Sequence, residues 1–281
     1  MNLSDIKIIE KILKKHGFSF KKSLGQNFLI NPEVCPQMAQ QACDQNTGVL
    51  EIGPGIGVLT QQLSKFAKKV VAIELDERLK NILPETLADC QNVEVIFGDA
   101  MKLDLHAIIK EKFADCHSVC VCANLPYYIT SPIIMMLLES KLPIKNITVM
   151  VQKEAAERLC AEVGTRESGA VTVAVNYYAN AEILFQVDRY SFMPPPNVDS
   201  AVIKLEIREK PPIEINDEKK FFSLVKSAFA QRRKTLVNTV SNTSNYSKEQ
   251  IKNALLEIGL NETVRAEQLT MEDLANLSNK L

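Results

Sequence analysis

The chain has 281 residues, 46% of them hydrophobic and 24% charged, and its formal net charge is −1. This length allows one large domain and a smaller one, each with a buried core. The balanced charge argues against a protein that coats nucleic acid indiscriminately. A membrane-spanning protein is not expected either, because no apolar run approaches the roughly 20 residues that a membrane helix needs.

The first element in chain order is an amphipathic helix over "MNLSDIKIIEKILKKHG", with Ser4 as a candidate N-cap. No secretory or transit peptide is expected, because the segment lacks an unbroken apolar stretch and contains Asp5 and Glu10. Residues 1–23 carry six lysines against two acids, and residues 219–234 carry six Lys or Arg and no acid. Two such patches are typical of a protein that docks on phosphate, although solvated helix faces can have the same composition.

From about residue 48, short β-rich runs alternate with helical patterns such as "GVLTQQLSKFAKK". This alternation predicts a parallel sheet with helices on both faces. The runs are almost continuously apolar, as strands that are covered on two sides require. They are "VLEIG", "VVAIELD", "VEVIFGDA", "VCVCANLP" and "ITVMVQ".

After a predicted helix around residues 153–162, the segments 170–188 and 199–209 are expected to be long β runs that add an antiparallel pair to the sheet. The two prolines and mixed charges of residues 208–220 indicate a linker, and the remainder has helical patterns. There, Ser247 with Gln250 can form a capping box, and Gly259 can end a helix. The predicted domains are therefore an α/β domain over residues 1–208 and a small helical domain over residues 209–281.

The seven cysteines stand at positions 35, 43, 90, 116, 120, 122 and 160, without C-x-x-C spacing. We interpret them as reduced thiols of a cytoplasmic protein. Cys120 and Cys122 alternate with valines in a predicted strand, so both should point to one face as small core residues. The three histidines show no ligand spacing either, and no metal site is predicted.

Three successive strand ends carry residues suited to a nucleoside. "VLEIGPGIGVLT" runs from a strand into Gly53 and Gly55 and then into a helix, so that the backbone can approach a ligand closely. The third glycine comes one residue too early for the G-x-G-x-x-G fingerprint, which favours another nucleoside-containing cofactor over NAD. Glu74 ends the next strand, where its carboxylate can accept from both ribose hydroxyls, and Asp99 ends the third, where it can accept from an adenine amino group.

The fourth strand ends in Asn124-Leu125-Pro126-Tyr127. These residues are common turn punctuation, but they also suit the alkylation of an adenine amine. The lone pair of that amine is delocalised into the ring, and two acceptors aimed at its hydrogens would localise it. The Asn124 side-chain carbonyl and the Leu125 backbone carbonyl can supply them, and Tyr127 offers a face on which the base can stack.

Several motifs in order resemble the small-subunit ribosomal RNA adenine dimethyltransferase family. They run from about residue 20 to 238, with a weaker echo in "RAEQLTMEDLANL". The resemblance implies a Rossmann-like class I methyltransferase sheet, mostly parallel with an antiparallel pair, plus a small C-terminal helical domain. The motifs are "KSLGQNFL", "EIGPGIGVLT", "IELD", "GDAM", "NLPYYIT", "QKEAAERL", "FMPPPNVDSAV" and "AFAQRRKTL".

The resemblance implies S-adenosylmethionine as the methyl donor. Carried over motif by motif, the implied cofactor-binding residues are Gln26, Asn27, Leu29, Gly53, Gly55, Glu74, Leu75, Asp99, Ala100 and Asn124. Asn124 would bridge the cofactor and the target amine, next to Leu125. Phe192 would close the base against Tyr127, although a core aromatic at a strand start is the plainer interpretation of Phe192.

The implied target is two adjacent adenosines in the 3′-terminal hairpin loop of small-subunit (16S) rRNA, within an immature small ribosomal subunit. A loop base leaves its stack at the lowest cost. Phosphates would be contacted by Lys21, Lys22, Arg232, Arg233 and Lys234, which position RNA without reading its sequence. A cytoplasmic monomer is expected.

Three alternatives remain at this point. A large-subunit rRNA adenine methyltransferase of the macrolide-resistance type shares the cofactor motifs, and only "AFAQRRKTL" and the helical tail favour the small-subunit enzyme. A ribosome-assembly factor could act mainly by binding, with methylation as a release step. A nicotinamide-dependent dehydrogenase is the weakest of the three, and failure to bind S-adenosylmethionine would favour it.

Overall fold

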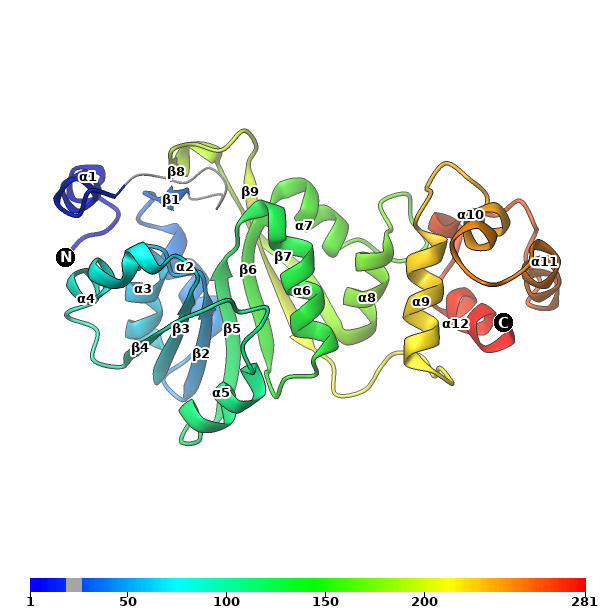
Figure 1. The fold of residues 1–281 in the computed structure, drawn as a ribbon, viewed down its shortest axis with the longest axis horizontal. Coiled ribbons are helices and arrows are strands. Elements are labelled where there is room, and N and C mark those ends of the chain that lie inside the picture. Colours follow the sequence, from blue (N-terminus) through cyan, green and yellow to red (C-terminus); the bar gives the residue numbers. More distant parts are fainter. Residues whose placement is uncertain (19–26) are drawn as a thin grey trace. The chain divides into compact units, whose positions relative to one another are not determined.

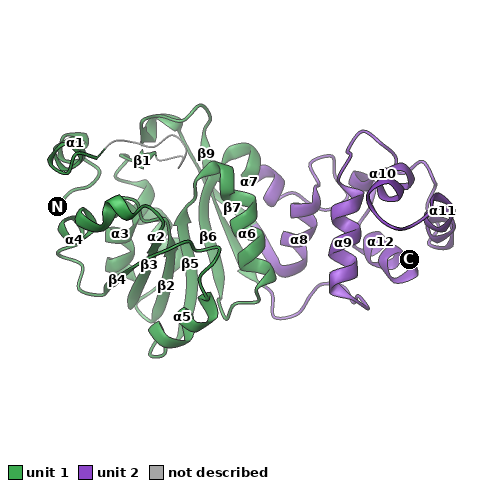
Figure 2. Ribbon diagram, in the orientation of Figure 1, with its two compact units in different colours: residues 1–156, 182–207 green, residues 157–181, 208–281 purple. Residues whose placement is uncertain are grey.

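The computed structural model describes residues 1–18 and 27–281 of the chain. The chain divides into two compact units, which Figure 2 shows in different colours. Unit 1 comprises residues 1–156 and 182–207, and unit 2 comprises residues 157–181 and 208–281. In the described chain, no helix is long and apolar enough to cross a membrane.

Unit 1 is built on a seven-stranded sheet with the order β4-β3-β2-β5-β6-β9-β7 (Figure 1). Neighbours from β4 to β6 are parallel, and β9 pairs antiparallel with β6, so the predicted mostly parallel sheet with an antiparallel pair is confirmed. The chain proceeds outward from β2 to β4 and then returns to β5 on the other side of β2. The strands are β2 (Thr47–Ile52), β3 (Lys69–Glu74), β4 (Val93–Phe97), β5 (Ser118–Asn124), β6 (Asn146–Gln152), β7 (Ala179–Val187) and β9 (Ser200–Ile207).

The helices of this region connect the strands and cover the sheet. They are α1 (Ile6–Lys15), α2 (Val34–Ala42), α3 (Val58–Phe66), α4 (Leu83–Thr86), α5 (Leu105–Lys112), α6 (Thr130–Glu139) and α7 (Lys153–Leu159). Helices α2 and α3 pack against each other, α2 on β5 and β6 and α3 on β3. Every residue of β2 is buried, as its apolar run predicts. Cys120 and Cys122 of β5 are both 0% exposed, which confirms them as core residues.

A separate two-stranded sheet joins distant parts of unit 1. Strand β1 (Phe28–Leu29) pairs antiparallel with β8 (Phe192–Met193), and Leu29 stands opposite Phe192. Short 3₁₀ turns precede β8 at Arg189–Ser191 and follow β5 at Tyr127–Ile129. The pair β1–β8 is too short for a sequence pattern to reveal, because alternation needs at least four residues to be recognised.

The N-terminal helix begins one residue later than predicted. Its N-cap is Asp5 and not Ser4: Asp5 has an extended backbone, and its side chain accepts a hydrogen bond from the Lys7 N–H. The bond length is 2.9 Å. Both residue types are good N-caps, so composition alone does not distinguish between them.

The expectation of one long β run over residues 170–188 is wrong for its first half. Residues Ala170–Tyr178 form α8, and the strand β7 begins only at Ala179. The Thr172 hydroxyl fixes the helix start, because it accepts the Gly169 N–H at 2.9 Å and donates to the Arg158 carbonyl at 2.8 Å. Residues 172–175 are all buried, so packing outweighs the strand preference of their β-branched side chains.

Unit 2 has its own hydrophobic core. Its further helices are α9 (Glu218–Ala228), α10 (Leu236–Thr243), α11 (Lys248–Glu257) and α12 (Met271–Lys280). Val173 and Tyr177 of α8 share this core with Phe221 of α9, which explains why residues 157–181 group with the C-terminal helices. The predicted capping box of Ser247 and Gln250 is present at the start of α11.

Candidate functional site

A cleft lies at the carboxyl edge of the parallel strands in unit 1, where the strand order reverses between β2 and β5. Open α/β sheets bind ligands at this kind of position. The cleft holds about 1220 Å³ of space that opens to solvent, enough for a nucleoside with a long substituent. It is lined by all predicted cofactor- and amine-binding residues that the structure describes: Asn27, Leu29, Gly53, Gly55, Glu74, Leu75, Asp99, Ala100, Asn124, Leu125, Tyr127 and Phe192.

The glycine-rich turn between β2 and α3 forms the floor of the cleft. Gly53 and Gly55 have φ angles of 71° and 59°, which only glycine adopts without strain. A Cβ atom added to Gly53 would meet no atom within 4 Å. The glycine therefore leaves open space beside the backbone, in which a ligand can approach the main chain closely.

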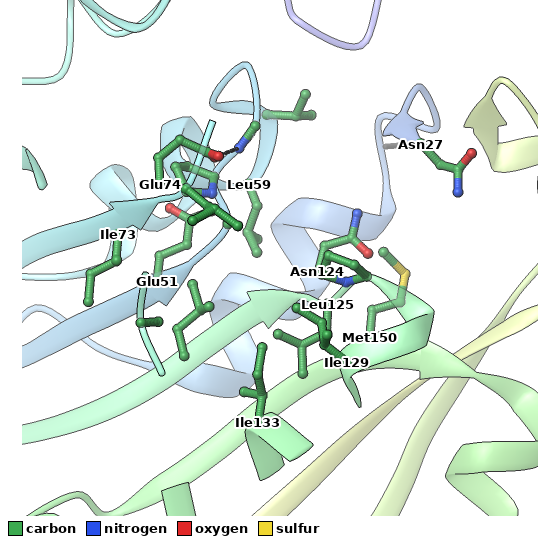
Figure 3. A pocket seen from close by; sticks show the side chains of 18 of the residues that line it. Asn27, Glu51, Leu59, Ile73, Glu74, Asn124, Leu125, Ile129, Ile133 and Met150 are labelled. Atoms are coloured by element: carbon green, nitrogen blue, oxygen red, sulfur yellow. Dashed lines mark hydrogen bonds between the residues drawn. The ribbon is translucent and has the colours of Figure 1, made fainter. Parts of the chain in front are cut away.

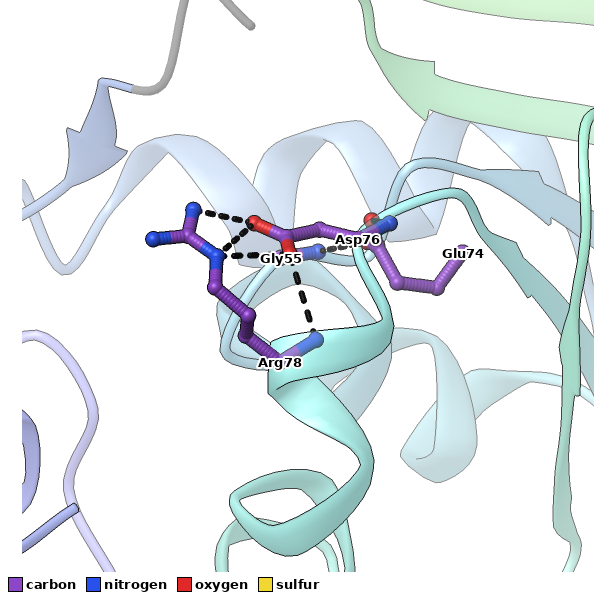
Figure 4. A network of polar contacts seen from close by, with 4 residues as sticks. All are labelled: Gly55, Glu74, Asp76 and Arg78. Atoms are coloured by element: carbon purple, nitrogen blue, oxygen red, sulfur yellow. Dashed lines mark hydrogen bonds and ion pairs between the residues drawn. The ribbon is translucent and has the colours of Figure 1, made fainter. Parts of the chain in front are cut away.

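Glu74 at the end of β3 holds this turn in place (Figure 4). One carboxylate oxygen, Oε2, accepts the Gly55 N–H at 3.1 Å, and the other, Oε1, accepts the Asp76 N–H at 2.7 Å. Burial raises the pKa of Glu74, while these two backbone hydrogen bonds oppose the shift. Asp76 is bound by Arg78, with 2.8 Å between Arg78 Nε and Asp76 Oδ1. Each Glu74 oxygen retains acceptor capacity, so the carboxylate can still bind ribose hydroxyls.

Glu51 is a residue of the cleft that the sequence analysis did not identify. It lies on β2 opposite Ala72 of β3, two residues before Glu74, and Figure 3 shows the side chains of Glu51 and Glu74 on neighbouring strands. Glu51 is only 1% exposed, and burial raises its pKa to about 8. Its Oε2 and the Oγ1 of Thr60 make no hydrogen bond of good geometry within residues 1–18 and 27–281, although the Thr60 hydroxyl lies close enough to oppose part of the rise in the pKa of Glu51. A buried carboxyl with an unpaired oxygen is costly unless a ligand binds to it.

Asp99 follows β4 at the next strand end. Its Oδ1 accepts the Met101 N–H at 3.0 Å, and its Oδ2 lies 3.5 Å from the Lys102 ammonium group. Leu75 and Met101 line the same end of the cleft and are 51% and 45% exposed. Exposed apolar side chains beside a partly exposed carboxylate suit a flat heterocycle with an amino group.

The opposite part of the cleft contains the end of β5. Neither the Asn124 side-chain amide nor the Leu125 carbonyl oxygen has a hydrogen bond within the described chain, and both line the cleft. Figure 3 shows Asn124 across the cleft from Glu74. Tyr127 is fixed through its hydroxyl, which lies 2.7 Å from Ser200 Oγ. Two unengaged acceptors thus stand next to an aromatic ring that cannot rotate freely.

Phe192 lines the cleft but is only 3% exposed, so it belongs to the core as well as to the cleft wall. Its pairing with Leu29 connects it to the segment that contains Asn27. The other predicted residues of that segment, Gln26 with Lys21 and Lys22, lie outside the described residues.

The predicted phosphate-binding residues at 232–234 belong to unit 2, and all three are exposed. Arg232 is already engaged: it donates to the Arg166 carbonyl and lies 3.7 Å from a Glu267 oxygen. Arg233 and Lys234 make no ion pair within the described part of the chain. Within residues 1–18 and 27–281, no group of three or more His, Cys, Asp or Glu side chains is placed to hold a metal ion.

The sheet order, the antiparallel β9 and the nucleoside-sized cleft at the strand reversal define a Rossmann-like fold of the class I methyltransferase type. Two solved enzyme structures share it. A dimethyladenosine transferase from Plasmodium falciparum superposes with a TM-score of 0.72 at 29% identity, over 89% of this chain and 95% of that chain. The 23S rRNA methyltransferase ErmE gives 0.66 at 26% identity, over 91% and 99% of the two chains.

The sequence comparisons identify the family. Residues 17–281 match the family described as ribosomal RNA adenine dimethylase. Ribosomal RNA small subunit methyltransferase A of Geobacillus thermodenitrificans is 51% identical over 276 residues, which are 97% of this chain and 94% of that protein. The protein of the same name from Bacillus mycoides is 50% identical over 274 residues, which are 96% and 94% of the two chains. The chain belongs to the ribosomal RNA adenine dimethylase family, and it is an S-adenosylmethionine-dependent methyltransferase.

The cleft fits this cofactor. S-adenosylmethionine carries a cationic ammonium group and a ribose with two hydroxyls, and the cleft contains two buried carboxyls, Glu51 and Glu74, whose oxygens can accept from such donors. The unpaired Oε2 of Glu51 and the open space beside Gly53 are features that a bound cationic nucleoside would use.

Proposed function

We propose that this enzyme dimethylates the exocyclic amines of two adjacent adenosines in the 3′-terminal hairpin loop of small-subunit rRNA. The observation that carries this proposal is the pair of unengaged acceptors, Asn124 and the Leu125 carbonyl, in a cleft that also contains the nucleoside-binding strand ends. The small-subunit target is supported by the name and the 51% identity of the Geobacillus relative.

The cofactor, when bound, supplies an electrophilic methyl group on its sulfonium. Glu74 would bind the ribose hydroxyls, while Asp99 and the Ala100 backbone would bind the adenine. Glu51 would bind the cofactor's ammonium group, because its Oε2 has no partner in the described chain. Asn27 and Leu29 would line the methionine side.

Asn124 and Leu125 would act on the target amine. Their two carbonyl oxygens would accept its hydrogens, which localises the nitrogen lone pair and directs it toward the methyl group. The chain needs no general base for this step, since the nitrogen becomes acidic on alkylation and releases its proton to water. A second round is possible because the singly methylated amine still carries one hydrogen for one of the two acceptors.

The target base would stack against Tyr127, whose ring is held by Ser200. Phe192 would provide the opposing surface. Moving the base out of its stack costs a few kcal/mol, and this cost is lowest for a base in a loop. A hairpin-loop target agrees with this cost. The basic run at 232–234 would contact phosphates and so position the RNA. Because Arg232 is bound to Glu267 and to a carbonyl, we assign the larger share of this contact to Arg233 and Lys234.

A large-subunit target is the second candidate, because ErmE covers this chain almost completely with the same fold. The lower identity to ErmE, 26% against 51% for the Geobacillus protein, favours the small subunit. We further infer that the enzyme acts in the cytoplasm, as a monomer, on an immature small ribosomal subunit.

The test is transfer of labelled methyl groups from S-adenosylmethionine to immature small subunits and, in parallel, to protein-free large-subunit RNA. Nucleoside analysis should find dimethyladenosine in the small subunit only. Label confined to the large-subunit RNA would make this a resistance-type enzyme. Label in neither substrate, with tight subunit binding, would support an assembly factor that acts by binding.

A further inference from the structure

Helix α1 is a fixed part of unit 1. Its inner face places Ile9, Ile12 and Leu13 in the core of the unit, where they are 0%, 4% and 6% exposed. At the C-terminal end of the helix, Lys15 and His16 both contact Glu85 Oε2, at 2.8 and 2.9 Å. The apolar face is therefore already covered by protein, which argues against insertion of this helix into a membrane surface.

The outer face of α1 is basic. Lys7, Lys11 and Lys14 are exposed and recur at spacings of four and three residues, so they share one side of the helix. Within the described residues none of them has a carboxylate within 4.0 Å, in contrast to Lys15. Of the two acids in this segment, the Asp5 side chain caps the helix, and Glu10 lies one turn from Lys7 and Lys14 without forming an ion pair with them in the described residues. The three charges cover about 10 Å along the axis, the length over which one nucleic acid strand presents about three phosphates.

The end of α1 lies beside the cleft. Phe18, three residues after the helix, packs against Phe28 with 6.4 Å between ring centroids, and Phe28 lines the cleft. The Arg78 guanidinium lies 4.4 Å from the centre of the Phe18 ring. Arg78 in turn binds the Asp76 carboxylate, and the Asp76 N–H donates to Glu74 in the cleft. Phosphates on either side of a base that enters the cleft could therefore reach the helix.

We propose that Lys7, Lys11 and Lys14 form a phosphate-binding surface for the RNA segment next to the target adenosine. The inference rests on the proposed function, and it concerns an element that precedes the family match at residues 17–281. Charge complementarity supports RNA as the occupant, because these lysines are concentrated on a chain whose net charge is only −1.

The test compares Lys7→Gln/Lys11→Gln/Lys14→Gln with a control triple of equal charge change, Lys65→Gln/Lys110→Gln/Lys145→Gln. The control lysines are exposed and belong to unit 1 outside α1. Binding to immature small subunits is measured between 50 and 200 mM salt. Three lost phosphate contacts should make the plot of log affinity against log salt less steep by about 2. Between 50 and 200 mM salt, the glutamine triple should therefore lose roughly 20-fold less affinity than the wild type does. The control should keep the wild-type slope.

Lysine-to-arginine substitution at the three α1 positions should preserve the slope, and this variant excludes loss of the helix as the cause. A wild-type slope in the glutamine triple, while the wild-type enzyme methylates the subunits, would overturn the inference and leave the proposed function standing. Failure of the wild-type enzyme to bind or methylate subunits would overturn both. Binding to phosphatidylserine vesicles that the glutamine triple abolishes, with an unchanged RNA slope, would assign the helix to a membrane instead.

Discussion

Replacing Glu51 by Gln should change how the stability of the cofactor-free protein depends on pH. Burial raises the pKa of the carboxyl from 4.5 to about 8. The native protein therefore keeps this proton up to about pH 8, whereas the unfolded chain releases it near pH 4.5. Between these values the unfolded state binds fewer protons, so the free energy of unfolding falls as pH rises. At about 1.4 kcal/mol per pH unit, the difference between 4.5 and 8 amounts to at most about 5 kcal/mol.

The assay is urea denaturation of the wild type, Glu51→Gln and the exposed control Glu139→Gln at pH 5, 7 and 9, without cofactor. Near pH 5 the wild type and Glu51→Gln should be similarly stable, because a protonated Glu and a Gln are nearly isosteric. At pH 9 Glu51→Gln should be the more stable protein by several kcal/mol, and Glu139→Gln should follow the wild type throughout. Parallel stability curves for the wild type and Glu51→Gln would show that this carboxyl ionises normally and would refute the argument.

Three further outcomes are expected. Glu74→Ala should weaken S-adenosylmethionine binding in a calorimetric titration, and unchanged affinity would remove Glu74 from the site. Because the Glu74 oxygens accept the Gly55 and Asp76 N–H groups, the same change should lower the free energy of unfolding by roughly 1–3 kcal/mol. Asn124→Ala should reduce the single-turnover rate of methyl transfer by roughly 10²–10³-fold at saturating S-adenosylmethionine. An unchanged rate would contradict the role of Asn124 at the amine. Replacing Arg232, Arg233 and Lys234 by neutral residues should flatten the salt dependence of RNA binding. When one residue at a time is restored in this variant, Arg232 should recover the smallest part of the salt dependence, because Glu267 already binds it. Equal recovery from each of the three residues would contradict this engagement of Arg232.

The amino-acid sequence predicted the cleft well because parallel strands bring their carboxyl ends to one edge. Gly53, Glu74, Asp99 and Asn124 are far apart in the chain, yet each lies at or just after the end of a recognisable strand, so the pattern of strands is enough to predict that they meet at one cleft. Their roles toward ligands stay predictions.

Other features depended on tertiary contacts. Residues 170–178 form a helix despite their β-branched residues, because the Thr172 hydroxyl fixes its start and the surroundings bury most of its surface. Glu51 resembled an ordinary residue of a glycine-rich motif, and only the structure shows that its carboxyl is buried without a partner for Oε2 in the described chain. One sequence signal did point to Glu51. The run "VLEIG" predicts a buried strand, and a glutamate inside such a strand is almost never fully buried unless its carboxyl is paired.

If this cleft converts two adjacent small-subunit adenosines to the dimethyl form, the products can be read directly from the RNA. The most direct measurement is mass spectrometry of 3′-terminal fragments of small-subunit rRNA after incubation of immature subunits with the enzyme and S-adenosylmethionine, with Asn124→Ala as the matched control. We expect four added methyl groups on two neighbouring adenosines with the wild type and a strongly reduced yield with Asn124→Ala. Methylation at another nucleotide, or an equal yield from Asn124→Ala, would contradict it.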